Sequence, residues 1–124
     1  MQEGSVVVLS DDESVLLEIQ NKLNYEGFCV DSFKKVPLFF DYLNKNTPIL
    51  IIIDFDLKSL DYVETIKRIK NDHRLSFAPI AVFSKNNEEL NIIEALDLGA
   101  DIYMVKPFSS KELVARCKAV LRSL

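Results

Sequence analysis

The sequence predicts an α/β fold: a doubly wound parallel sheet of five strands in the order 2-1-3-4-5, with five helices on its two faces. The first indication is segment 49–54, in which five consecutive aliphatic residues are followed by Asp54. A short apolar run rich in β-branched residues is typical of a central parallel strand that is covered on both faces. The second indication is that such runs alternate with amphipathic segments along the whole chain. Alternation of this kind implies right-handed crossovers, and therefore a parallel sheet.

The apolar runs predict five strands, near 5–10, 28–32, 49–54, 79–84 and 102–105. The amphipathic segments predict five helices, at 13–24, 35–44, 61–72, 87–98 and 109–123. No linker, repeat or low-complexity segment interrupts the pattern, and 124 residues are enough to bury the core of one domain. We therefore treat residues 1–124 as a single domain.

The first two helices have clear apolar faces. In segment 13–24 this face consists of Val15, Leu16, Ile19 and Leu23. Gly27 then offers the backbone freedom that a helix end needs. In segment 35–44 the corresponding face consists of Leu38, Phe39, Tyr42 and Leu43.

The last three helices add start and stop signals. Segment 61–72 carries Ile66 and Ile69, and Asp61 with Glu64 has the spacing of a capping box. Segment 87–98 carries the apolar residues Leu90, Ile93 and Leu96, and it stops at Gly99. Segment 109–123 begins at Ser109 with Glu112 at the third helical position, and we expect it to bury Leu113, Ala119 and Val120 or their neighbours.

Composition excludes several classes of protein. The chain is 48% apolar and 27% charged, which argues against disorder, and no apolar run approaches the ~20 residues that cross a bilayer. Segment 1–5 lacks the basic and apolar regions of a signal peptide, so we expect a cytoplasmic protein without membrane contact. A net charge of −4 argues against nucleic-acid binding by this domain itself. Cys29 and Cys117 match no metal spacing and are interpreted as reduced packing residues.

Acidic residues follow two strands that are neighbours in the predicted sheet. Asp11 and Asp12 follow the first strand, and Asp54 ends the third. The carboxyl ends of these strands share one edge, so we expect the three carboxylates to converge there. Like charges so close raise each other's pKa, unless a divalent cation such as Mg²⁺ lies among them. The alternative for Asp11 or Asp12 is a helix N-cap.

The fourth and fifth strands end in a hydroxyl and an ammonium group. Ser84 and Lys106 would flank Asp54 and supply the hydrogen-bond donor and positive charge that a phosphoryl group requires. The alternatives are an N-cap for Ser84 and a solvated charge for Lys106. Lys106 precedes Pro107, so we expect a cis peptide bond there that turns the lysine inward.

These residues together resemble a known family. The chain is similar to the receiver domains of two-component response regulators, which have a CheY-like, flavodoxin-like fold. The resemblance runs from the first strand to the last helix. The matching pieces, in order, are Asp11-Asp12, Asp54, Ser84, Leu98-Gly99-Ala100-Asp101 and Val105-Lys106-Pro107-Phe108.

The resemblance assigns a role to each residue of the site. It implies that Asp54 is the phosphoacceptor and that Asp11, Asp12 and Asp54 hold Mg²⁺, together with the backbone carbonyl of Asp56. Lys106 would contact the phosphoryl oxygens, while Ser84 would move toward the phosphoryl group and draw the switch residue Tyr103 inward. The chemistry is that of a carboxylate nucleophile forming an acyl phosphate. The partner would be a histidine kinase or a phosphotransfer protein.

The rim of the site departs from the family pattern. Lys58 and Tyr62 replace a proline and a glycine that usually follow the acceptor, and Lys85 replaces a small residue after the switch hydroxyl. Asp56 adds a negative charge beside the acceptor. We expect Lys85 and Asp56 to pair across the mouth of the site and to slow entry of a phosphodonor or of the hydrolytic water.

The C-terminal third is similar to receivers of OmpR/PhoB-type winged-helix transcription factors. Those pair symmetrically through the fourth helix, fifth strand and fifth helix. Ile102 replaces one acid of that pattern, and the alternative is a solvated charged face. The charges at matching positions, which predict a possible homodimer face, are Asp97, Asp101, Glu112, Arg116, Lys118 and Arg122.

Three functions remain open from the sequence. The leading one is a phosphorylation-driven switch rather than a turnover enzyme, with transcription regulated through a separate output domain. Since Arg122-Ser123-Leu124 stops where a linker would begin, we expect a truncated chain. A second is a pseudo-receiver that binds partners without phosphorylation, which the rim residues favour. The third is a haloacid-dehalogenase-type phosphatase, because Asp54-Phe55-Asp56 resembles its Asp-x-Asp motif, although Lys58 breaks that pattern.

Overall fold

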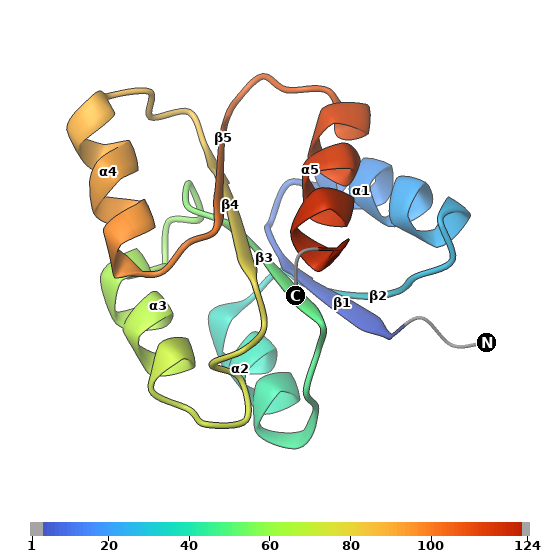
Figure 1. The fold of residues 1–124 in the computed structure, drawn as a ribbon, viewed down its shortest axis with the longest axis horizontal. Helices are drawn as coiled ribbons and strands as arrows, with labels where there is room; N and C mark the ends of the chain where they lie inside the picture. Colours follow the sequence, from blue (N-terminus) through green and yellow to red (C-terminus); the bar gives the residue numbers. More distant parts are fainter. Residues whose placement is uncertain (1–3, 123–124) are drawn as a thin grey trace.

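The computed structural model describes residues 4–122 and confirms the predicted α/β fold (Figure 1). Five parallel strands form one sheet in the order β2-β1-β3-β4-β5. Strands and helices alternate along the chain, in the order β1 Ser5–Leu9, α1 Glu13–Tyr25, β2 Cys29–Phe33, α2 Val36–Lys45, β3 Leu50–Asp54, α3 Tyr62–Lys70, β4 Ile80–Ser84, α4 Glu89–Leu98, β5 Ile102–Val105 and α5 Ser110–Arg122.

Helices cover both faces of the sheet. In Figure 1, α1 and α5 lie on one side of the strands, and α2, α3 and α4 lie on the other. Side chains alternate along the buried β3 strand, so Ile51 and Ile53 join one core and Leu50 and Ile52 join the other. All five residues of β3 are buried, which explains why the segment is apolar throughout.

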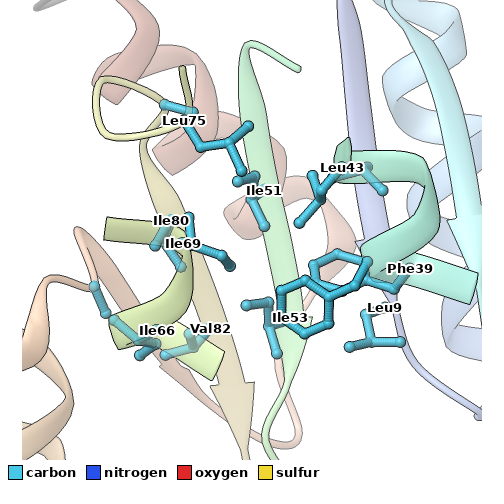
Figure 2. Close-up of a cluster of buried hydrophobic side chains, with 14 of the residues drawn as sticks. Leu9, Phe39, Leu43, Ile51, Ile53, Ile66, Ile69, Leu75, Ile80 and Val82 are labelled. Carbon is cyan, nitrogen blue, oxygen red and sulfur yellow. The ribbon is translucent and has the colours of Figure 1, made fainter. Parts of the chain in front are cut away.

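The larger core lies between the sheet and helices α2 and α3. Figure 2 shows Ile51 and Ile53 of β3 between Phe39 of α2 and Ile69 of α3. Each of these side chains is fully buried, and burial of such a side chain contributes about 1.5–3 kcal/mol. This packing fixes the carboxyl end of β3, where Asp54 follows Ile53.

Three of the predicted helix start and stop signals are confirmed, although α3 ends at Lys70 and α4 begins at Glu89, each two residues inside the predicted bound. Asp61 caps α3 by accepting a hydrogen bond from the Glu64 N–H at 3.1 Å, and Ser109 accepts one from the Glu112 N–H at 3.0 Å. Gly99 ends α4 with a φ of 128°, a conformation that residues with a Cβ rarely adopt.

Some helix faces differ from the prediction. In α2, Leu38 is half exposed, and Phe40 is buried against α3 instead. Leu90, Ile93 and Leu96 of α4 were expected to form its core face, but all three are exposed. Ala95 is the buried residue of this helix instead. In α5, Ala119 was expected to be buried but is exposed, and Cys117 is buried instead. In each case the helix itself was predicted, and the error lies in which of its residues face the core.

The two cysteines differ in burial. Cys117 is fully buried in the core against α1, as predicted, and burial raises the pKa of its thiol to about 12. Cys29 is exposed on the edge strand β2, so the prediction of a packing role is wrong there. Within residues 4–122, no helix is long and apolar enough to cross a membrane. The expectation that segment 1–5 is not a signal peptide and the expectation of a truncation after Arg122-Ser123-Leu124 both involve residues 1–3 and 123–124, which lie outside the described residues.

Candidate functional site

Four strands of the sheet deliver polar side chains to one edge. Ser10 follows β1, Asp54 ends β3, Ser84 ends β4 and Lys106 follows β5. All strands run in the same direction, and their register places Asp54 beside Phe83 and Ser84 beside Val105. The carboxyl ends therefore converge, as the sequence predicted.

Asp54 lies at the centre of this edge and is almost completely buried, with 1% of its surface exposed. Its Oδ1 accepts hydrogen bonds from the Asp56 N–H at 2.9 Å and from Lys106 Nζ at 3.1 Å. Its Oδ2 accepts one from the Ser10 hydroxyl at 2.8 Å. A buried carboxylate needs such hydrogen-bond partners, and here they hold both oxygens of Asp54 in place.

Lys106 connects two carboxylates. Its Nζ lies 3.1 Å from Asp54 Oδ1 and 3.0 Å from Asp56 Oδ2, and 5.1 Å from the centre of the Phe83 ring. Burial acts to lower the pKa of Lys106, but its hydrogen bonds to Asp56 and Asp54 outweigh that effect and raise it. The side chain therefore remains an ammonium group. The Lys106–Pro107 bond is cis, as expected.

Asp56 is bound more extensively than the sequence indicated. Its Oδ1 accepts from the Ser84 hydroxyl at 2.9 Å, and its Oδ2 accepts from the Lys85 N–H at 2.9 Å, besides the contact with Lys106. Burial acts to raise the pKa of Asp56, but the hydrogen bonds from Lys85 and Lys106 hold it below its ordinary value. The predicted pairing with the Lys85 ammonium is wrong, because Lys85 contributes its backbone N–H and Lys106 supplies the charge.

Asp11 and Asp12 are exposed at the start of α1. Asp12 is the N-cap: its Oδ1 accepts from the Val15 N–H at 3.3 Å and from the Ser14 hydroxyl at 3.0 Å, and these bonds lower its pKa. Within residues 4–122, no three acidic, histidine or cysteine side chains are grouped closely enough to hold a metal. The expected convergence of Asp11, Asp12 and Asp54 is therefore not found, since Asp12 turns toward α1 and Asp54 toward Lys106.

The residues at this edge nevertheless fit Mg²⁺. The ion prefers oxygen ligands, takes one or two protein carboxylates and keeps several waters, so it does not need a three-carboxylate cluster. Asp54 on β3 and the acidic pair after β1 offer this donor set from adjacent strands. The chemistry of the donors supports a magnesium site that is completed by solvent and phosphate.

A hydrogen-bonded chain leads from the site to Tyr103 on β5. The Ser84 hydroxyl donates to Asp56 and accepts from the Asn86 N–H at 3.0 Å. The Tyr103 hydroxyl then donates to the Asn86 carbonyl at 2.9 Å. The predicted switch pair, Ser84 and Tyr103, is therefore joined through one residue of the β4–α4 loop.

Two further residues, Ser10 and Tyr62, have contacts that were not predicted from the sequence. Ser10 is fully buried, and it joins Asp54 to the β1–α1 loop by accepting from the Asp12 N–H at 3.1 Å. Its signal was a hydroxyl at the end of an otherwise apolar run. Tyr62 was identified only as a departure from the family, but its ring stacks on Phe55 at 4.6 Å and its hydroxyl binds Glu94 of α4 at 2.5 Å.

Other predicted residues lie apart from the acceptor. Lys58 is exposed in the loop after β3. On the predicted dimer face, Asp101 accepts a hydrogen bond from the Ile80 N–H at 2.8 Å, and Glu112 pairs with Arg116 one turn away on α5 at 3.2 Å. Lys118 pairs with Glu26 at the end of α1 at 2.8 Å, so this charge is held toward α1. Asp97 and Arg122 lie on α4 and α5.

Comparison with known proteins identifies the family. The sequence model of the response regulator receiver domain family matches residues 6–118 of this chain. The chain belongs to the receiver domain family. It is similar to the phosphate regulon regulatory protein PhoB of Pseudomonas aeruginosa, with 36% identity over 121 residues, and to the alkaline phosphatase synthesis regulatory protein PhoP of Bacillus subtilis, with 35% identity over 117 residues. These alignments cover 96% and 94% of this chain but 52% and 48% of the relatives.

The receiver domain thus spans about half the length of the curated relatives that it matches. Among solved structures, it resembles HP1043, an orphan response regulator of H. pylori, with a TM-score of 0.86 and 27% identity, over 96% of this chain and 97% of that one. Membership of the receiver family argues against the phosphatase alternative that the Asp-x-Asp motif suggested.

Proposed function

We propose that this receiver domain accepts a phosphoryl group on Asp54 from the phosphohistidine of a histidine kinase or a phosphotransfer protein. The observation that carries the proposal is the buried Asp54 carboxylate with the Lys106 ammonium 3.1 Å from its Oδ1. An ionised nucleophile beside a fixed cation suits the addition of a negatively charged group.

The transfer forms one bond and breaks one. A carboxylate oxygen of Asp54 attacks phosphorus, the P–N bond to the donor imidazole breaks, and the departing nitrogen takes a proton from solvent. Lys106 balances the charge that develops on the phosphoryl oxygens, while the Ser84 hydroxyl would turn from Asp56 to donate to one of them. The product is an acyl phosphate that water later hydrolyses, so the domain is a switch rather than a turnover enzyme.

Magnesium completes the proposed site. Asp54 with Asp11 or Asp12, together with the Asp56 backbone carbonyl, would hold the ion. When bound, it would neutralise charge on the phosphoryl oxygens. Asp12 would combine this role with capping of α1, since its Oδ1 accepts from Val15 and Ser14.

The output is a changed partner surface rather than a product. The relatives' names describe transcriptional regulatory proteins, and we infer that the domain controls transcription in the cytoplasm through a separate DNA-binding domain. Its own net charge of −4 disfavours contact with DNA. Homodimerisation through α4, β5 and α5 would use Asp97, Asp101, Glu112, Arg116 and Arg122.

Intact-mass spectrometry after incubation with acetyl phosphate tests the proposal. The wild type should gain one phosphoryl group in the presence of Mg²⁺ and none in the presence of EDTA. Asp54→Asn is the matched control, because it keeps the shape of the side chain and removes the nucleophile. An equal mass gain in both proteins, or none in the wild type, would refute the assignment.

A further inference from the structure

The three donors around Asp56 form a binding site for an oxyanion. The Ser84 hydroxyl, the Lys85 N–H and the Lys106 ammonium all point at its carboxylate, at 2.9, 2.9 and 3.0 Å. A hydroxyl, a backbone amide and a cation are the donor types that hold phosphoryl oxygens. In this structure the oxyanion that they hold is the side chain of Asp56.

Asp56 lies close enough to the acceptor to share its cation. Lys106 touches Asp54 Oδ1 and Asp56 Oδ2 at the same time, so the two carboxylates share one cation. A phosphoryl group on Asp54 would place further negative charge against Asp56 and would require the same ammonium group. Two oxyanions that contact the same ammonium group repel each other. The phosphoryl group and the Asp56 carboxylate therefore cannot both keep Ser84, Lys85 and Lys106 as donors.

We propose that the Asp56 carboxylate is an internal ligand of the phosphoryl-binding donors, which has to be displaced when Asp54 is phosphorylated. The inference rests on the proposed function, because it takes Asp54 as the acceptor. Phosphorylation then exchanges one oxyanion for another at Ser84, Lys85 and Lys106.

The same ligand holds the connection to β5 in the unphosphorylated domain. Asp56 fixes the Ser84 hydroxyl, which accepts from the Asn86 N–H, while the Asn86 carbonyl binds Tyr103. Without an anion beside Ser84, this hydroxyl and the loop that follows lose their anchor. Asp56 thus maintains the Ser84–Tyr103 arrangement in the unphosphorylated domain.

The kinetic test compares Asp56→Asn with wild type. Asn keeps the size of Asp56 but removes the charge that binds Lys106. Removing one charge-assisted competitor should raise the initial rate of phosphorylation by acetyl phosphate roughly tenfold. Asp41→Asn is the matched control, an acid-to-amide change at an exposed position on α2, and it should leave the rate unchanged.

The dependence of the rate on salt concentration distinguishes displacement of Asp56 from Lys106 from a general repulsion between Asp56 and the negatively charged acetyl phosphate. A contact between partly buried groups is screened weakly, whereas a general surface field fades at high ionic strength. The rate ratio of Asp56→Asn to wild type should therefore persist at high salt. A ratio that falls to one at high salt, or a slower variant at any salt, would overturn the proposal.

A second measurement does not depend on phosphorylation. Amide NMR spectra of the unphosphorylated wild type and of Asp56→Ala should differ at Lys85, Asn86 and Tyr103, with the spectrum of Asp41→Asn unchanged there. If none of the proteins accepts phosphate, the proposed function fails, but these shifts still test the internal ligand. Unchanged signals at all three residues would show that Asp56 does not hold the connection.

Discussion

The hydroxyl of Ser10 donates a hydrogen bond to Oδ2 of Asp54 at 2.8 Å, and both residues are almost completely buried. The same hydroxyl accepts from the Asp12 N–H at 3.1 Å. Ser10 thus ties the acceptor carboxylate to the loop that carries the acidic pair. This contact orients Asp54 from the side opposite Lys106.

Replacement of Ser10 by alanine should impair both stability and reaction. It leaves Asp54 Oδ2 without this donor, which should lower the free energy of unfolding by about 1–3 kcal/mol and slow phosphorylation by acetyl phosphate several-fold. Ser10→Thr keeps the hydroxyl and should recover most of the rate. Urea titration and intact-mass spectrometry measure the two effects. Equal rates for Ser10→Ala and wild type would show that the contact is irrelevant to the reaction.

Asp12 allows its two roles to be separated. Asp12→Asn keeps a good N-cap, whereas Asp12→Ala loses the cap and should lower the free energy of unfolding by about 1 kcal/mol. If Asp12 also holds Mg²⁺, Asp12→Asn should need a higher Mg²⁺ concentration for half-maximal phosphorylation while its thermal midpoint stays near that of wild type. Identical Mg²⁺ dependence in Asp12→Asn and wild type would restrict Asp12 to capping.

Lys85 should prove replaceable at its side chain. Asp56 binds its backbone N–H, so Lys85→Ala keeps that hydrogen bond and should change phosphorylation and dephosphorylation rates by less than about twofold. A larger effect on either rate would restore the idea that the Lys85 ammonium guards the mouth of the site.

The acid limb of stability should depend on Asp56. Its pKa in the folded protein lies below the ordinary value of 3.8, so the unfolded chain binds more protons in that range and stability rises with pH. The contribution is present above the unfolded pKa and is lost as pH falls through the lowered, folded pKa. Chemical unfolding between about pH 5 and pH 3 should therefore show a shallower loss for Asp56→Asn than for wild type. Parallel curves would contradict the assigned shift.

Much of this molecule could be predicted from its sequence. The strand order follows from the alternation of apolar runs and amphipathic segments, and the gathering of Asp54, Ser84 and Lys106 follows from parallel strands ending at one edge. Asp61 and Ser109 cap their helices as their spacing predicted. These features depend on the spacing of apolar and capping residues and on the order of strands and helices, both of which can be read from the sequence.

The details that failed depend on side-chain direction. Asp56 was expected to face the Lys85 ammonium, but the nearer donors are Ser84 and the Lys85 backbone. Leu90, Ile93 and Leu96 of α4 were assigned to the core, but they are exposed, and Ala95 is the buried residue of that helix. Periodicity identifies an apolar face, but tertiary contact decides which part of it is covered.

Locating the phosphoryl group on the chain tests the central claim most directly. After incubation with acetyl phosphate and Mg²⁺, borohydride reduces an aspartyl phosphate to homoserine, and tandem mass spectrometry of the digested protein then identifies the residue. We expect homoserine at position 54, and none after incubation without Mg²⁺. Modification at Asp11, Asp12 or Asp56 in place of Asp54, or no modified residue at all, would contradict the account.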